Sequence, residues 1–215
     1  MKKAVVIGGS RGIGKAIASS LKTLGIKVIS TSTKTLDTSS IEKTKEFIQR
    51  TKKLDYLVLN TGGPPPLNFF EITESDWIKY FNQLFLSFVL ILQKIKINNN
   101  GYIFLISSHT IKSPQDNLVL SNSYRLALSS VLKTVSNLRN HQNITCINIA
   151  PGPIKTDRLK FLVKDMKKFE KSLPMGRAGT VNEIANFIKA IVQYKIKYIN
   201  GVTINFDGGL SKNIF

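Results

Sequence analysis

The chain has 215 residues, of which 42% are hydrophobic, and its 31 lysines and arginines outnumber its 13 aspartates and glutamates. This length suits one domain with a sizeable core, and the apolar content excludes a disordered chain. Cys146 is the only cysteine, which excludes a disulfide scaffold.

Short apolar runs alternate with stretches of helical periodicity along the chain. In chain order the sequence predicts a strand at 3–8, a helix at 13–24, a strand at 27–33, a helix at 39–52, a strand at 54–59, a helix at 75–96, a strand at 101–106, a helix at 121–140, a strand at 144–149, helices at 157–171 and 181–194, and a strand at 198–206. The alternation predicts an α/β fold: one Rossmann-like domain over residues 1–215, with a doubly wound parallel sheet and helices on both faces.

The net charge of +18 raises the question of a nucleic-acid partner, because cationic side chains that neutralise phosphates drive such binding. The positive residues are mostly lysines spread along the chain, densest at 43–53 and 155–171, and no basic tail or aromatic-interleaved RNA-binding motif accompanies them. We therefore expect no nucleic-acid partner. The alternative is a patch for an anionic cofactor or an acidic partner.

The longest apolar run, Phe85 to Leu92, is far shorter than the roughly 20 residues that cross a bilayer. The start of the chain lacks the longer apolar region and the cleavage site of a signal peptide. We expect a cytoplasmic protein without a membrane partner. No histidine, cysteine and carboxylate cluster has the spacing of metal ligands, so we expect no metal site.

Glycines gather where the first predicted strand turns into the first helix. They let the backbone approach a pyrophosphate, and the helix that follows offers free N–H groups and the positive end of its dipole. We therefore expect a dinucleotide cofactor to bind at Gly8, Ser10, Arg11, Gly12, Ile13 and Gly14.

The residues after the second predicted strand bear on the choice of cofactor. Where NAD enzymes usually place an acidic residue, Thr31 and its neighbours carry hydroxyls, and no carboxylate precedes Asp37. Hydroxyls together with the cations of Arg11 and Lys34 suit a 2′-phosphate. The sequence favours NADP, with NAD as the less favoured alternative.

Further motifs follow in a fixed order. They are Leu59-Asn60-Thr61-Gly62, Ile106-Ser107-Ser108, the segment from Pro151 to Thr156, and the groups 174–179, 183–185 and 201–209. Together with the glycine turn, in which Ile7 replaces a threonine, they resemble the motifs of the short-chain dehydrogenase/reductase family over nearly the whole chain. The last groups are similar to the C-terminal signature of its 3-oxoacyl-acyl-carrier-protein reductases.

This resemblance implies hydride transfer between a nicotinamide and a carbonyl or alcohol carbon. It implies cofactor contacts from Asn60, Gly62, Pro151, Gly152 and Thr156. It also implies a homodimer or homotetramer in which the helices at 75–96 and 121–140 form a four-helix bundle.

The catalytic positions depart from the family pattern. The resemblance keeps Ser108 for the substrate oxygen, but it places Ser121 at the tyrosine position, Arg125 at the lysine position and Leu84 at the asparagine position. A serine is a far weaker acid than a phenol, arginine stays protonated, and leucine holds no water. Standard Tyr–Lys chemistry is therefore absent here, although Arg125 can still donate to the cofactor ribose.

Two nearby residues are candidate substitutes. Tyr124 lies close to Ser121 on the predicted helix, where the Arg125 cation could activate its phenol; alternatively it packs at a subunit interface. His109 titrates near neutrality and could serve as an acid; alternatively it is an ordinary surface residue. We take Ser108, Ser121, Tyr124 and Arg125 as the candidate catalytic residues.

Two hypotheses stay open. The first is an NADP-dependent oxidoreductase that acts on a small-molecule or carrier-protein-linked acyl substrate, similar to 3-oxoacyl-carrier-protein reductases. The second is a catalytically impaired nucleotide-binding relative with a regulatory or unknown role. About 20 residues separate Thr33 from Leu54, where the family fits a helix, a strand and a helix. We therefore expect a trimmed adenine pocket, with Thr35 to Asp37 as the remnant of a middle strand.

Overall fold

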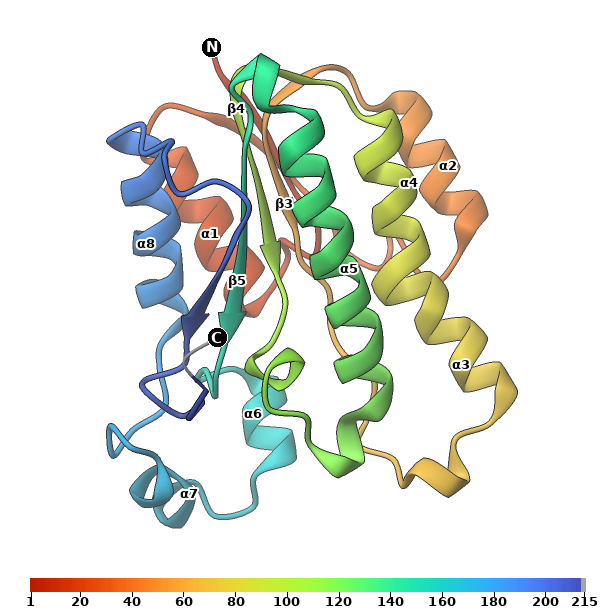
Figure 1. Cartoon of the computed structure of the whole chain (residues 1–215), viewed down its shortest axis with the longest axis vertical. Coiled ribbons are helices and arrows are strands. Elements are labelled where there is room, and N and C mark those ends of the chain that lie inside the picture. Colours follow the sequence, from red (N-terminus) through yellow and green to blue (C-terminus); the bar gives the residue numbers. More distant parts are fainter. Residues whose placement is uncertain (214–215) are drawn as a thin grey trace.

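The computed structural model describes residues 1–213 and contains a six-stranded sheet with helices on both faces (Figure 1). The strands pair in parallel in the order β2-β1-β3-β4-β5-β6. They are β1 (Lys3–Val6), β2 (Lys27–Ser30), β3 (Leu54–Leu59), β4 (Ile97–Ile106), β5 (Thr145–Pro151) and β6 (Val202–Phe206). The predicted doubly wound parallel sheet is confirmed.

Helices cover both faces of this sheet. One face carries α1 and α8, and the other carries α2, α4 and α5 (Figure 1). These helices are α1 (Gly12–Lys22), α2 (Ile41–Arg50), α4 (Ser87–Lys94), α5 (Val119–Leu138) and α8 (Val181–Gln193). Because both faces are covered, all six residues of β3 are buried, and its sequence is an almost unbroken apolar run. No helix within residues 1–213 is long and apolar enough to cross a membrane.

The long helix predicted at 75–96 has an irregular middle. It starts as α3 (Glu74–Phe81), passes through a π-helical turn at Asn82–Leu86 and resumes as α4. π-Helical turns are rare and often occur at functional sites. This one carries Gln83, whose side-chain amide donates to the Gly62 carbonyl at 2.9 Å and so ties the helix to the loop after β3.

Other boundaries shift because of local hydrogen bonds. The helix predicted at 157–171 is two short helices, α6 (Asp157–Leu162) and α7 (Met166–Ser172). Asp165 starts the second one, because its side chain accepts a hydrogen bond from the Lys168 N–H at 3.0 Å. β4 begins earlier than the predicted residue 101, and β6 is shorter than the predicted 198–206.

The sheet ends at β2, and no strand lies beyond it in the described chain. The expectation that Thr35 to Asp37 keep a remnant of a strand is wrong, because Thr35 ends a turn and Leu36 and Asp37 have no regular structure. Leu36 is buried there against the apolar side of α2, and the Thr35 hydroxyl accepts a hydrogen bond from the Ser32 N–H at 2.9 Å. The chain therefore passes from β2 to α2 through two short turns, at 33–35 and 38–39.

Hydrogen bonds join the ends of β1, β2 and β3 beneath the glycine turn. Thr31, which is only 3% exposed, accepts a hydrogen bond from the Gly8 N–H at 3.1 Å. The Asn60 side-chain amide donates to the Gly8 carbonyl at 3.2 Å. Gly8 has a φ of +63°, and a Cβ atom there would lie 2.6 Å from the Asn60 carbonyl oxygen. Both the backbone conformation and the close approach therefore require glycine.

We expect Thr31→Val to lower the free energy of unfolding by about 1–3 kcal/mol, because it leaves the Gly8 N–H without its acceptor. Thr33→Val is the matched control, since Thr33 is exposed two residues away. Urea denaturation of both variants measures the difference. Equal stability of the two variants would contradict the bracing role of Thr31.

Candidate active site

A cavity of about 390 Å³ opens at the carboxyl ends of the strands. Its walls come from the loop after β3, the ends of β4 and β5, the start of α5, and α6 with the segment that follows it. Figure 1 shows α6 and α7 at this end of the sheet, where the β5 arrow points. Ligands of open α/β sheets bind at this edge.

The glycine turn forms a binding surface next to this cavity. α1 has no side-chain cap at Arg11 and no acidic residue in its first turn, so its first N–H groups face outward without a protein anion. A Cβ atom on Gly12 would approach only the Thr156 side chain, at 3.6 Å, whereas one on Gly14 would collide with the Gly8 carbonyl. The turn therefore leaves open space at Gly12 while its other glycines are needed for packing. This geometry fits a pyrophosphate.

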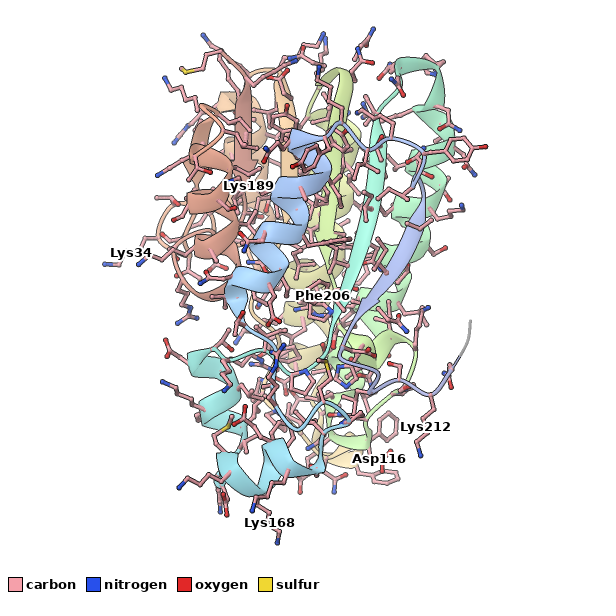
Figure 2. All side chains as sticks on the ribbon, turned by 90° about the vertical axis from the view of Figure 1, so that its left-hand side faces the viewer. Lys34, Asp116, Lys168, Lys189, Phe206 and Lys212 are labelled. Carbon is pink, nitrogen blue, oxygen red and sulfur yellow. The ribbon has the colours of Figure 1, made fainter. Side chains whose placement is uncertain are left out.

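The other residues predicted to bind a cofactor lie at different depths. Ser10 and Arg11 are exposed beside the turn, and Ile13 lines the cavity. Figure 2 shows Lys34 extending away from the body of the protein. Among residues 1–213, no ion pair involves Arg11 or Lys34. Thr31 does not face this surface, because its hydroxyl is buried under the turn as the acceptor for Gly8.

The remaining predicted cofactor positions line the cavity itself. They are Asn60, Gly62, Pro151, Gly152 and Thr156. A Cβ atom on Gly152 would lie 2.8 Å from the Asp207 Cα, so glycine is required for the close passage of these two chain segments. The Thr156 hydroxyl caps α6 by accepting from the Leu159 N–H at 3.3 Å.

Ser108 follows β4 and faces the cavity. Its hydroxyl oxygen accepts two hydrogen bonds, from the Thr110 N–H at 3.2 Å and from the Thr110 hydroxyl at 3.0 Å. A hydroxyl that accepts two hydrogen bonds keeps its own hydrogen for a third group. Ser108 is therefore oriented to donate to an oxygen in the cavity.

Ser121 and Arg125 lie one turn apart on α5, and both line the cavity. The Arg125 Nε donates to the Ser121 hydroxyl oxygen at 3.2 Å. Ser121, like Ser108, thus keeps its hydrogen free, and the adjacent cation strengthens it as a donor. The tyrosine-to-serine and lysine-to-arginine replacements form one interacting pair.

Arg125 is almost fully buried, and four of its five N–H groups donate hydrogen bonds. Its other bonds run to the Ile106 carbonyl at 3.0 Å, the Ser107 carbonyl at 3.4 Å and the Thr61 carbonyl at 3.1 Å. Burial, together with the nearby charge of Arg158, lowers its pKa to about 10, which leaves it charged at neutral pH. The expected role as a ribose donor therefore rests on one remaining N–H of the five in a guanidinium.

Tyr124 and Leu84 lie outside the cavity lining. Leu84 is buried in an apolar cluster with Tyr80 and Leu120, against which Tyr124 packs. The Tyr124 hydroxyl donates to the Trp77 carbonyl at 3.1 Å, and burial raises the pKa of this phenol. The expectation that Arg125 activates Tyr124 is thus corrected, because its hydroxyl is already engaged and its pKa moves in the opposite direction.

His109, the other candidate substitute, lines the cavity directly after Ser108. Its Nδ1 lies 3.2 Å from the Pro151 carbonyl oxygen, which can only accept, so Nδ1 carries a hydrogen. Burial lowers the pKa of His109 below its ordinary value of 6.5, partly opposed by the Pro151 hydrogen bond and the charge of Asp207. Nε2 is therefore the atom that gains and loses a proton.

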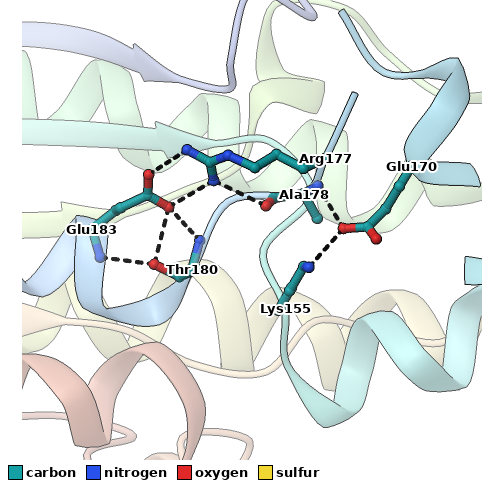
Figure 3. Close-up of polar contacts among 6 residues, drawn as sticks. All are labelled: Lys155, Glu170, Arg177, Ala178, Thr180 and Glu183. Carbon is teal, nitrogen blue, oxygen red and sulfur yellow. Dashed lines mark hydrogen bonds and ion pairs between the residues drawn. The ribbon is translucent and has the colours of Figure 1, made fainter. Parts of the chain in front are cut away.

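A polar network holds the segment beside the cavity (Figure 3). Arg177 pairs with Glu183 at 2.7 Å, and Glu183 also accepts from the Thr180 N–H at 2.7 Å at the start of α8. Lys155 pairs with Glu170 of α7 at 2.9 Å. These bonds connect the segment from α6 to α8 with the end of β5, where the cavity lies.

Arg158 is a cavity residue that sequence reasoning missed. From the sequence, Arg158 is one of several basic residues between 155 and 171. Its position directly after Thr156 and Asp157 is the one signal that could have indicated a residue of the cavity. In the structure it lines the cavity and donates to the Gly63 carbonyl at 3.1 Å and the Pro64 carbonyl at 2.6 Å.

Proteins of similar sequence include reductases that act on acyl-carrier-protein substrates. The chain matches the family profile described as enoyl-(acyl carrier protein) reductase over residues 35–211. It is 31% identical to 3-oxoacyl-[acyl-carrier-protein] reductase FabG of Buchnera aphidicola subsp. Schizaphis graminum, over 97% of both chains.

Two solved structures share the fold. A short-chain dehydrogenase family protein from Francisella tularensis superposes with a TM-score of 0.90 at 20% identity, over 99% of this chain and 100% of that one. The angucycline C-6 ketoreductase LanV with bound NADP superposes with a TM-score of 0.85 at 19% identity, over 97% and 95%. The profile match and the FabG relative show that the chain belongs to the short-chain dehydrogenase/reductase family of oxidoreductases.

Proposed function

We propose that this protein is an NADP-dependent oxidoreductase that reduces a carbonyl compound, or oxidises the corresponding alcohol. The observation that carries the proposal is one cavity with two serine hydroxyls free to donate, Ser108 and Ser121, beside a glycine turn whose helix has no protein cap. The impaired alternative has no such observation in its favour.

The cofactor is the group that this surface fits. When bound, the reduced nicotinamide supplies a hydride to the carbonyl carbon. The backbone N–H groups at Gly12 and Ile13 would hold the pyrophosphate, and Arg11 with Lys34 would meet a 2′-phosphate, since no carboxylate within residues 1–213 pairs with either cation. Asn60, Gly62, Pro151, Gly152 and Thr156 would surround the remainder.

Ser108 and Ser121 stabilise the charge that develops on the substrate oxygen. Both donate hydrogen bonds to this oxygen, and the buried Arg125 cation behind Ser121 adds a positive potential in a poorly solvated site. Neither serine needs to lose a proton for this role. The arrangement thus replaces the acidity of a phenol with two oriented donors.

The proton that completes the alcohol comes from His109 in this proposal. Its Nε2 is the titrating atom of a side chain that lines the same cavity. In reduction the Nε2 proton would pass to the substrate oxygen, which gains negative charge as the C=O double bond becomes a single bond. The neutral imidazole is then protonated again from water.

The relatives narrow the substrate and assembly proposals. The FabG relative is a 3-oxoacyl-[acyl-carrier-protein] reductase, which supports a small 3-oxoacyl compound, free or carried, as the substrate class. We place the reaction in the cytoplasm, where such a soluble substrate would be met.

The apolar groove between α4 and α5, which includes Val131 and the 67% exposed Leu138, supports a homodimer or homotetramer built on these helices.

The protein is expected to bind NADPH and to oxidise it with acetoacetyl coenzyme A or acetoacetate as the carbonyl substrate. NADPH fluorescence measures binding, and its absorbance measures turnover. Binding without turnover of either compound would contradict the proposed reaction, and absence of NADPH binding would contradict the proposed cofactor.

Replacing Ser121 with alanine is expected to lower kcat by roughly a hundredfold, because one donor to the developing oxyanion is lost. Tyr124→Phe, three residues away on the same helix, is expected to keep the kcat of the parent protein, because the Tyr124 hydroxyl donates to the Trp77 carbonyl. Steady-state kinetics of both variants test this. A loss of activity confined to Tyr124→Phe would reverse the assignment.

The reduction rate is expected to rise as pH falls through a value below 6.5, because the pKa of His109 is lowered and the protonated form is the acid. His109→Gln should remove this limb of the pH profile. His141→Gln changes the chain's other histidine, which is exposed, and should keep it. A pH profile unchanged by His109→Gln would show that the proton has another source.

A further inference from the structure

The titratable side chains of the cavity are unusual in their balance of charge. Arg125, Arg158 and His109 line it, whereas no aspartate, glutamate or lysine does. Within residues 1–213, neither arginine forms an ion pair with a carboxylate. Among residues 1–213, the cavity lining thus holds two permanent cations and no anion.

The two guanidinium groups converge on one point, Gly63. A Cβ atom on this glycine would lie 3.1 Å from one terminal nitrogen of Arg158 and 3.7 Å from one of Arg125. The absence of a side chain keeps this point open. Gly63 lies in the loop after β3, whose carbonyls hold both arginines in place.

The two positive charges lie close enough to affect each other, although Arg158 is exposed and keeps contact with solvent. The charge of Arg158 adds to the burial that lowers the pKa of Arg125, and loss of solvent around its guanidinium lowers the pKa of Arg158. Arg158 donates to the Gly63 and Pro64 carbonyls, which leaves three of its five N–H groups without a partner among residues 1–213. An anion beside Gly63 would relieve the repulsion and accept these donors.

We propose that the substrate is a small oxo acid whose carboxylate binds Arg158 beside Gly63, with Arg125 contributing its charge. This inference rests on the proposed function and names its substrate class. Arg125 links the two ends of such a molecule, since its Nε contacts Ser121 and one of its terminal nitrogens faces Gly63. The carbonyl and the carboxylate are therefore about one guanidinium apart, as in a short oxo acid.

The size of the cavity agrees with a short acid. Its 390 Å³ is near the lower end of the roughly 300–1,000 Å³ range of small-molecule sites, and a nicotinamide would take part of this volume. A phosphate of the cofactor is the competing source of an anion. The uncapped start of α1 already provides for a pyrophosphate, which favours the substrate as the partner of Arg158.

The test compares acetoacetate with methyl acetoacetate, which carry the same ketone and differ in the carboxylate charge. Calorimetric titration into the NADP⁺ complex of the full chain measures binding without turnover. We expect acetoacetate to bind about tenfold more tightly than the ester, since a charge-assisted bond is lost in the latter. Arg158→Met should equalise the two dissociation constants, and Arg158→Lys should keep part of the preference.

Lys160→Met is the matched control, because it removes one positive charge from the same helix at an exposed position. It should keep the full preference, and Arg158→Met should keep the NADP⁺ affinity of the parent protein. Equal binding of acid and ester by the parent protein, or binding of neither, would overturn the inference, as would a preference that survives Arg158→Met. A loss of NADP⁺ affinity in Arg158→Met that matches the loss of acetoacetate affinity would assign Arg158 to the cofactor instead. Failure of the parent protein to bind NADP⁺ would overturn the proposed function itself.

Discussion

The buried guanidinium of Arg125 connects the parts of the candidate active site. It donates to Ser121 on its own helix, to the Ile106 and Ser107 carbonyls at the end of β4, and to the Thr61 carbonyl in the loop after β3. Three elements that are far apart in the chain thus meet at one cation. Removing such a group would leave several buried carbonyls and a hydroxyl without their donor, which is costly in a poorly solvated interior.

This arrangement explains how the family fold accommodates the changed catalytic positions. A lysine and a tyrosine act together through acidity, whereas arginine stays charged and serine stays protonated. In the proposed reaction, Arg125 orients and polarises Ser121, Thr110 orients Ser108, and His109 supplies the proton. The other altered position, Leu84, is buried in an apolar cluster against which Tyr124 packs, and neither residue lines the cavity.

Much of the fold could be predicted from the sequence, because each buried parallel strand is a short apolar run and each helix has one apolar face. The cofactor turn could be placed for a similar reason, since its glycines directly follow the first strand. The break between α6 and α7 depends on one capping aspartate, Asp165, and the π-helical turn at 82–86 interrupts a pattern that is helical throughout. Such local features do not change the hydrophobic pattern.

The directions of polar side chains were harder to predict. Thr31 stands where a cofactor contact was expected, but its hydroxyl turns inward to Gly8. Tyr124 is near Ser121 in sequence, yet the helix rotates it toward Trp77. Arg158 reaches the cavity because α6 folds back over the loop after β3, and this long-range contact has no signature within its own segment.

We propose that Ser108, Ser121 and Arg125 form the oxyanion side of the active site. A crystal structure of the NADP⁺ complex with acetoacetate tests it most directly. We expect the ketone oxygen within hydrogen-bond distance of both serine hydroxyls, Arg125 still bound to Ser121, and the carboxylate beside Arg158. A ketone oxygen bound instead to Tyr124, or a nicotinamide located outside this cavity, would contradict it.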